Sequence, residues 1–211
     1  MCTPPLTAPT EVHIQKYTKQ RLLMVKETPE LVFNILSHKV ESEKILFEDP
    51  SPETGFILIP DMKWDLKTVS SLYLVAITHS HSISTLRDLK IEHIPMLKSI
   101  RRETGRIVRS KWGLEGEMAL RFYVHYQPSY YHFHVHVVNA NYSGFKGVSA
   151  GQAHLLEDII SLLELSSPIG PTLISQMSLT YQLGEHHGLF KLLVKAQDKI
   201  DEETRKGILY V

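Results

Sequence analysis

Apolar and polar residues alternate along the segment Tyr131 to Asn139, and this alternation predicts a β-strand with one buried face. The preceding segment, Leu120 to Tyr126, also has the composition of a strand. Between them lies the turn Gln127-Pro128-Ser129, in which the proline cannot continue a hydrogen-bonded ladder. The two segments therefore predict a β-hairpin.

Other apolar patterns predict the remaining elements. Short apolar runs over 44–48 and 55–60, joined by a loop that contains prolines and a glycine, predict a second hairpin. A further strand is predicted over 175–183. Helical spacing of apolar residues predicts two helices within 11–47, interrupted at Thr28-Pro29, and further helices over 66–77, 91–111, 152–163 and 189–196. Paired strands interspersed with helices indicate an α+β domain in which helices pack on an antiparallel sheet.

The charge balance limits the partners that the chain can bind. Lys plus Arg and Asp plus Glu each number 23, so the formal net charge is zero and no large positive field is available to hold a long nucleic acid. We therefore expect any nucleotide ligand to be small. The single cysteine, Cys2, excludes an internal disulfide and suits a reducing compartment, so we expect the chain in the cytoplasm, the nucleus or both.

Targeting and membrane signals are not apparent in the sequence. Prolines interrupt the N-terminus where a signal peptide needs an apolar run, and no segment holds about 18 consecutive apolar residues. The sequence thus predicts neither secretion nor membrane spanning.

Three histidines occupy alternate positions of the predicted strand: His132, His134 and His136. Because side chains alternate across a strand, the three imidazoles are expected on one face, lining an open cleft. Like-facing side chains lie roughly 6.5 to 7 Å apart, about the span of a phosphate group. One neutral ring can attack phosphorus while others donate hydrogen bonds to it. His125 is expected in the same cleft if it shares a face of the partner strand with Tyr123.

The spacing of these histidines leaves two further interpretations open. Two strand histidines separated by one residue can converge on a tetrahedral zinc ion. The rings can also cover a polar sheet face without taking part in chemistry. Spacing does not distinguish these interpretations from phosphate binding.

The run HFHVHVV over 132–138 matches the pattern His-X-His-X-His-X-X, with X apolar, and resembles the histidine triad (HIT) superfamily of nucleotide hydrolases and transferases. Segments over 45–65, 72–90, 120–138 and 153–160 resemble its scavenger mRNA decapping enzyme branch, and the resemblance extends from about residue 30 to the C-terminus. It implies a HIT-like fold and hydrolysis of the triphosphate bridge of 7-methylguanosine-capped dinucleotides or short capped RNA fragments, with release of 7-methylguanosine monophosphate.

The resemblance also implies roles for individual residues. His134 takes the position of the nucleophile that forms a covalent nucleotidyl-histidine intermediate. The resemblance implies that no cofactor and no metal is needed, and that the chain forms a homodimer. The residues that it places at the phosphates are His125, Ser129, Tyr130, His132 and His136, and those that it places at the cap are Glu41, Asp61 and Lys63.

Two positions depart from the family pattern. Leu31 stands where the family carries a tryptophan that stacks on the methylguanine ring, and neither Trp64 nor Trp112 fits that place. Gln152 stands where the family carries a basic residue near the phosphates. Both changes lead us to expect weakened cap recognition.

The domain organisation predicted from the resemblance has two parts. Residues 1–29 are expected to be a remnant of the N-terminal domain that closes over the active site in the family, and residues 30–211 a HIT-like catalytic domain. A chain without that lid is expected to bind substrate loosely. Two alternatives therefore stay open: a catalytically impaired or regulatory module that dimerises with full-length protomers, and a hydrolase of another dinucleoside polyphosphate.

Overall fold

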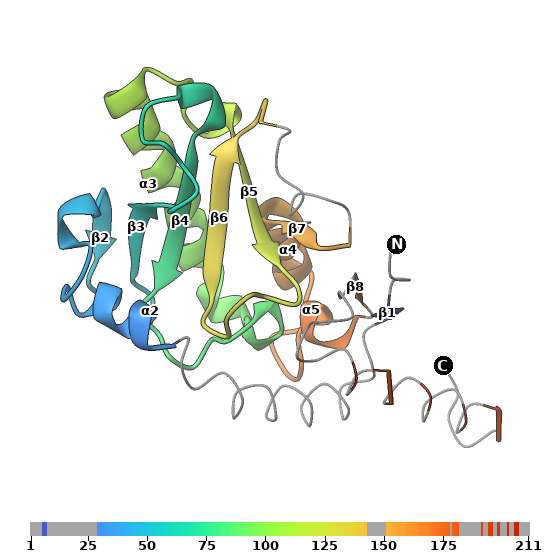
Figure 1. Ribbon diagram of the computed structural model, residues 1–211. Helices are drawn as coiled ribbons and strands as arrows, with labels where there is room; N and C mark the ends of the chain where they lie inside the picture. The colour runs from blue at the N-terminus through green and yellow to red at the C-terminus, as the bar shows by residue number, and fades with distance from the viewer. Residues whose placement is uncertain are drawn as a thin grey trace.

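A six-stranded antiparallel sheet is the centre of the described structure (Figure 1). The computed structural model describes residues 6–7, 29–142, 151–177 and 179–181, and isolated positions from 191 to 206. Within these residues the strand order is β2-β3-β4-β6-β5-β7, and β1 pairs separately with β8. The strands are β1 (Leu6–Thr7), β2 (Phe47–Asp49), β3 (Phe56–Pro60), β4 (Tyr73–Thr78), β5 (Leu120–His125), β6 (His134–Asn139), β7 (Ala153–Leu155) and β8 (Thr180–Tyr181). The predicted α+β class with an antiparallel sheet is confirmed.

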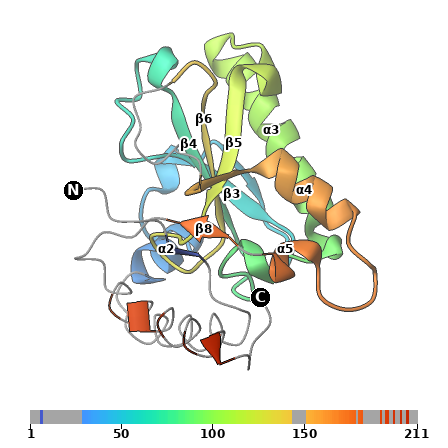
Figure 2. The same ribbon diagram turned by 90° about the vertical axis from the view of Figure 1, so that its right-hand side faces the viewer.

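Helices cover the two faces of the sheet unequally. The longest, α3 (Ile94–Trp112), lies with α4 (Leu156–Glu164) along one face, as Figure 2 shows. The short helix α2 (Pro29–Leu36) packs on the opposite face. The remaining short elements are α5 (Leu173–Gln176) and the 3-10 turns η1 (Ser42–Lys44), η2 (Val69–Ser71), η3 (Leu86–Asp88), η4 (Ile91–His93) and η5 (Gly116–Ala119).

The sheet separates two apolar clusters. Alternate residues of β3, β4 and β6, such as Leu58, Leu74 and Val137, belong to the larger cluster beneath α3 and α4. On the other face, Val32 and Ile35 of α2 pack on side chains of β3 and β4. The buried residues of this second cluster come from α2, β3 and β4. The same face of β6 and β5 carries the polar side chains described below.

Helix α3 confirms the helix predicted over 91–111. Its apolar residues face the core, and its only proline lies in the first turn, where a missing N–H costs no hydrogen bond. The helix ends at Gly113, whose φ of 67° is in the left-handed region that glycine adopts readily. The Gly113 N–H donates to the carbonyls of Arg109 and Val108, which closes the last turn.

Three sequence predictions need correction. The helix predicted over 66–77 is wrong: the segment contains η2 and the fully buried strand β4. A strand buried on both faces is apolar at nearly every position, so its residues also fit a helical stripe. The helix predicted over 152–163 begins with strand β7, and the described residues of the strand predicted over 175–183 contain the end of α5 and the two residues of β8.

The remaining predictions are confirmed or fall outside the described residues. Both hairpins form, since β2 pairs with β3 and β5 pairs with β6, each antiparallel. Helix α2 begins at Pro29, the second residue of the predicted interruption at Thr28-Pro29. The helix predicted before that interruption lies outside the described residues, as does most of the helix predicted over 189–196. In the described part of the chain, no helix combines the length and apolar character needed to cross a membrane.

Candidate active site

Strand β6 brings two of the three alternating histidines into one cluster with His125. Figure 1 shows β6 between β4 and β5. His136 lies opposite Tyr123 of β5, and its ring centroid is 4.4 Å from that of His125 and 4.8 Å from that of His134. We refer to His125, His134 and His136 as the histidine cluster. Among the described residues, no three His, Cys, Asp or Glu side chains are arranged to hold a metal ion.

His132 precedes β6 and points toward α2. Its Nε2 lies 2.6 Å from the carbonyl oxygen of Thr78, and its ring makes edge contacts with His81 and Phe33. Because a carbonyl only accepts, the Nε2 of His132 carries a proton and donates it to this bond. These contacts fit an orienting role between the start of β6 and α2.

The protonation of His134 is determined by its backbone neighbour. Its Nδ1 lies 2.8 Å from the carbonyl oxygen of His132, so Nδ1 carries the proton and Nε2 has a free lone pair. Burial lowers the pKa of His134 from 6.5 to about 4, and the ring is therefore neutral at pH 7. Within the described structure Nε2 is buried and has no hydrogen-bond partner. This is the state that a nucleophilic imidazole requires.

The expectation that His134 faces an open cleft is wrong. The residue is only 3% exposed. The ring of Tyr130, in the turn before β6, stacks on the imidazole with a centroid distance of 4.1 Å and an interplanar angle of 16°. A phosphate therefore reaches Nε2 only if neighbouring side chains move.

Two tyrosines that the sequence analysis did not single out hold His136. The hydroxyl of Tyr73 on β4 lies 2.9 Å from Nδ1, and the ring of Tyr123 stacks on the imidazole at a centroid distance of 5.2 Å. Burial keeps the pKa of His136 well below its usual value, so this ring is also neutral at pH 7. Tyr73 was missed because its segment was predicted as a helix.

A cavity of about 240 Å³ lies between α2, the end of β3 and the turn before β6. We call it the α2 cavity. Its lining includes the three predicted cap residues together with the predicted phosphate residues Ser129, Tyr130 and His136. Aliphatic side chains form the rest of its wall: Leu31, Val32, Ile35, Ile59, Met62, Val75 and Ile77, with Pro60. The lining of the cavity thus combines an apolar wall with two carboxylates, an ammonium and an imidazole.

The polar residues of the α2 cavity have definite partners. Glu41 forms an ion pair with Lys44 at 2.8 Å. The carboxylate of Asp61 accepts the backbone N–H of Lys63 at 2.9 Å, and the Nζ of Lys63 lies 5.8 Å from the centroid of the Tyr73 ring. Asp61 therefore fixes the turn from which Lys63 extends toward the side of His136.

The two departures from the family pattern lie near other predicted site residues. Leu31 lines the α2 cavity and is 50% exposed. Trp64 packs edge-on against Trp112 in the core, at a centroid distance of 5.3 Å. The carbonyl of Gln152 accepts the N–H of Tyr126 at 3.0 Å, which places Gln152 beside the end of β5 that carries His125.

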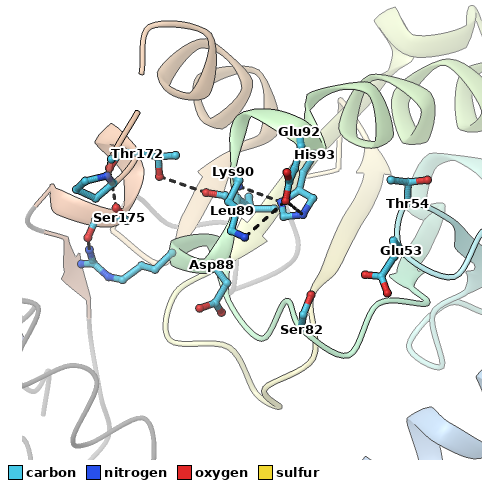
Figure 3. A pocket seen from close by; sticks show the side chains of 13 residues that line it. Glu53, Thr54, Ser82, Asp88, Leu89, Lys90, Glu92, His93, Thr172 and Ser175 are labelled. Atoms are coloured by element: carbon cyan, nitrogen blue, oxygen red, sulfur yellow. Dashed lines mark hydrogen bonds and ion pairs between the residues drawn. The ribbon is translucent and has the colours of Figure 1, made fainter. Parts of the chain in front are cut away.

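A larger cavity, of about 780 Å³, lies at η3, η4 and α5 (Figure 3). Its polar groups bond to one another: Asp88 accepts from the N–H of Thr85, the Nδ1 of His93 accepts from the N–H of Lys90, and Thr172 donates to a backbone carbonyl. No residue proposed for catalysis or cap binding lines it. We therefore place the chemistry at the smaller α2 cavity, whose lining includes His136, a residue with an Nε2 that has no partner within the described structure.

Comparison with known proteins finds one family and several similar chains. A family model described as "Scavenger mRNA decapping enzyme C-term binding" matches residues 30–151. A relative from Schizosaccharomyces pombe, named m7GpppX diphosphatase, is 40% identical over 203 residues, which cover 87% of this chain and 65% of the relative. Relatives of the same name from Mus musculus and Homo sapiens are 40% and 39% identical, over 90% and 89% of this chain. The chain spans 59 to 65% of the length of these three relatives.

Proposed function

Since the chain belongs to the scavenger mRNA decapping enzyme family of the histidine triad superfamily, we propose that it hydrolyses the triphosphate bridge of 7-methylguanosine-capped dinucleotides or short capped RNA fragments. The observation that carries the proposal is the His134 ring, which is neutral, holds its Nδ1 proton on a carbonyl and keeps Nε2 unpartnered among the described residues. The names of the relatives support the choice of substrate.

The reaction proceeds in two displacements. The lone pair of His134 Nε2 attacks the phosphorus nearest the methylguanosine, a P–N bond forms, and the bond from that phosphorus to the bridging oxygen breaks. The electron pair leaves with the nucleoside diphosphate portion of the substrate. Water then attacks the same phosphorus and releases a proton to the solvent, the electron pair of the P–N bond returns to Nε2, and 7-methylguanosine monophosphate leaves.

The carbonyl of His132 assists the first displacement. When Nε2 becomes bonded to phosphorus, the imidazole ring becomes cationic, and the Nδ1–H bond to this carbonyl strengthens because its donor is now charged. Nitrogens of His136 and His125 donate to the non-bridging oxygens and stabilise the charge that develops there. No cofactor takes part in this scheme.

The α2 cavity receives the methylated base. The carboxylates of Glu41 and Asp61 face a ring that carries positive charge after methylation, which strengthens their hydrogen bonds to its edge. Lys63, which also lines the cavity, contacts the bound cap, and Ser129, at the same cavity, contacts the phosphates. The base thus enters between α2 and the turn after β3, with its phosphates toward the histidine cluster.

We further propose that residues 30–211 act as the catalytic domain, that the protein is a homodimer, and that it works in the cytoplasm, the nucleus or both. These proposals extend the family resemblance. Light scattering of the purified chain tests the dimer, and fluorescence imaging of the tagged protein tests the location.

The deciding experiment is cleavage of a capped dinucleotide in the presence of a chelator, with product analysis. We expect 7-methylguanosine monophosphate and a nucleoside diphosphate from the unaltered chain, and loss of activity by about 10³-fold or more in His134→Asn. Unchanged turnover in His134→Asn would remove the nucleophile assignment. Activity that disappears on chelation would favour metal chemistry.

A second candidate function is hydrolysis of other dinucleoside polyphosphates. The observation that favours it is the aliphatic residue Leu31 at the rim of the α2 cavity, which offers no stacking partner for a cationic base. Comparison of kcat/KM for methylated and unmethylated capped dinucleotides and for a diadenosine polyphosphate decides between the two. A clear preference for the methylated cap favours decapping. If no compound is cleaved, the alternative of an impaired or regulatory module gains support.

A further inference from the structure

Tyr73 makes a polar contact with the histidine cluster from a strand that contributes no predicted catalytic residue. The side chain is 1% exposed, and its hydroxyl lies 2.9 Å from the Nδ1 of His136. A second buried hydroxyl, that of Tyr123, donates to the Tyr73 oxygen at 3.5 Å. The three side chains form a short polar chain that crosses from β5 through β4 to the central strand β6.

The role of this chain depends on the tautomer of His136. A neutral imidazole carries one proton, on Nδ1 or on Nε2. His136 is neutral because burial depresses its pKa, and its Nε2 is buried without a partner among the described residues. If the proton lies on Nε2, this nitrogen can donate to a phosphate oxygen. If the proton lies on Nδ1, a lone pair faces that oxygen and repels it.

We propose that Tyr73 is a positioning residue for phosphoryl transfer, whose hydroxyl donates to the Nδ1 of His136 and so fixes the tautomer in which Nε2 carries the proton. The phosphate-directed part of this inference rests on the proposed function. The oxygen of Tyr73 lies 2.9 Å from the Nδ1 of His136 and 3.5 Å from the Tyr123 hydroxyl, so His136 is the nearer acceptor for the proton of Tyr73. Burial raises the pKa of Tyr73 and keeps that hydroxyl protonated.

The arrangement gives neighbouring rings opposite functions. His134 bonds a carbonyl through Nδ1 and therefore presents a lone pair at Nε2. His136 bonds a hydroxyl through Nδ1 and presents an N–H at Nε2. The two rings meet edge-on, with an interplanar angle of 82°. One attacks phosphorus while the other donates to its oxygen, so two chemically identical side chains serve as nucleophile and as hydrogen-bond donor.

The tautomer is measurable without substrate. Nitrogen NMR of the full chain with labelled histidine, at pH 7.5, distinguishes protonated from unprotonated ring nitrogens. We expect His136 to show a protonated Nε2 and an unprotonated Nδ1, and Tyr73→Phe to shift both signals toward a mixture of tautomers. The matched control is Tyr126→Phe, which removes a buried hydroxyl that accepts from Arg87 instead. This control should leave the His136 signals unchanged.

Kinetics test the consequence for catalysis. We expect Tyr73→Phe to lower kcat roughly 2- to 10-fold with little change in KM, the effect of one neutral hydrogen bond. The loss should disappear in a His136→Gln background, because Tyr73 acts through His136. A merely structural role would lower activity equally in both backgrounds. Thermal melting of each variant confirms that it is folded.

The outcomes separate this inference from the proposed function. A protonated Nδ1 on His136 in the unaltered chain, or identical His136 signals in Tyr73→Phe, overturns the tautomer assignment whether or not caps are cleaved. If the signals are as expected but no capped dinucleotide is cleaved, the proposed function fails while the assignment stands. An equal loss of kcat in both backgrounds overturns the positioning role.

Discussion

The phenol ring of Tyr130 lies almost parallel to the imidazole of His134, with 4.1 Å between the ring centroids. The contact removes from water the ring that we propose as nucleophile, and burial is the main cause of its lowered pKa. We therefore predict that Tyr130→Ala raises the pKa of His134 from about 4 toward 6.5. A pH titration of the His134 ring signals by NMR measures this change.

The matched control for this prediction is Tyr131→Ala. Tyr131 belongs to the same turn, and its hydroxyl donates to the side chain of Gln127. This variant should leave the titration of His134 as it is in the unaltered chain. If Tyr130→Ala also leaves the titration unchanged, the side chain of Tyr130 does not exclude water from His134.

The buried histidines make stability depend on pH. The pKa values of His132, His134 and His136 are all lowered by burial, so the unfolded chain binds protons at acidic pH that the folded chain rejects. These groups therefore do not reduce the free energy of unfolding above pH 6.5, and they reduce it progressively as the pH falls toward 4. For His134 the difference between 6.5 and about 4 corresponds to on the order of 3 kcal/mol.

Denaturant unfolding between pH 7.5 and 4.5 measures this dependence. We expect the free energy of unfolding to fall across this range, and to fall less steeply in His134→Asn, which lacks one of the titrating rings. The exposed substitution Met118→Asn serves as control and should keep the slope of the unaltered chain. Equal slopes in all three proteins would contradict a buried neutral His134.

Local patterns predicted the elements whose two faces differ. The β5–β6 hairpin follows from alternation and a proline-containing turn, and α3 from a helical stripe that ends at a glycine. Strand β4 was missed because it is buried on both faces, which removes the alternation that identifies a strand. Because β4 was missed, Tyr73 was missed as well: its contact with His136 depends on the pairing of β4 with β6.

In the site, too, local sequence patterns predicted some features and not others. The alternation in β6 predicted that His134 and His136 would share a face, and the contact between His125 and His136 follows from the pairing of β5 with β6. The stacking of Tyr130 on His134 depends on how the turn before β6 folds back, which a local pattern does not encode. Glu41 and Asp61 line the same cavity although they come from different segments of the chain, and only the family resemblance suggested that both belong to one site.

Substitutions of Glu41 and Lys44 test cap recognition, because they are expected to change KM in opposite directions. The Lys44 ammonium lies 2.8 Å from the Glu41 carboxylate and competes with a cationic base for it. We predict that Glu41→Gln raises KM for a methylated capped dinucleotide about 10-fold, since a charge-assisted hydrogen bond is lost. The effect on the unmethylated compound should be smaller.

The paired variant Lys44→Ala should act in the opposite direction. Lys44 is partly exposed, so its removal is expected to lower KM for the methylated compound by at most about 5-fold. Steady-state kinetics with both compounds measure the two effects. If Lys44→Ala raises KM as much as Glu41→Gln does, Lys44 holds the carboxylate in place instead of competing for it.

Leu31 determines how strongly the α2 cavity can hold a cationic ring. It is 50% exposed at the rim of the cavity, so a larger aromatic side chain can be placed there without displacing the core. A stacked tryptophan contributes on the order of 1 to 3 kcal/mol, and Leu31→Trp should therefore lower KM for the methylated capped dinucleotide roughly 5- to 150-fold.

The control Leu165→Trp introduces the same ring at a position that is 75% exposed and does not line the cavity, and it should leave KM unchanged. Because methylation makes the base cationic, the gain from Leu31→Trp should be larger for the methylated than for the unmethylated compound. Equal gains for the two compounds would mean that the tryptophan adds only apolar contact and that Leu31 does not face the charged ring.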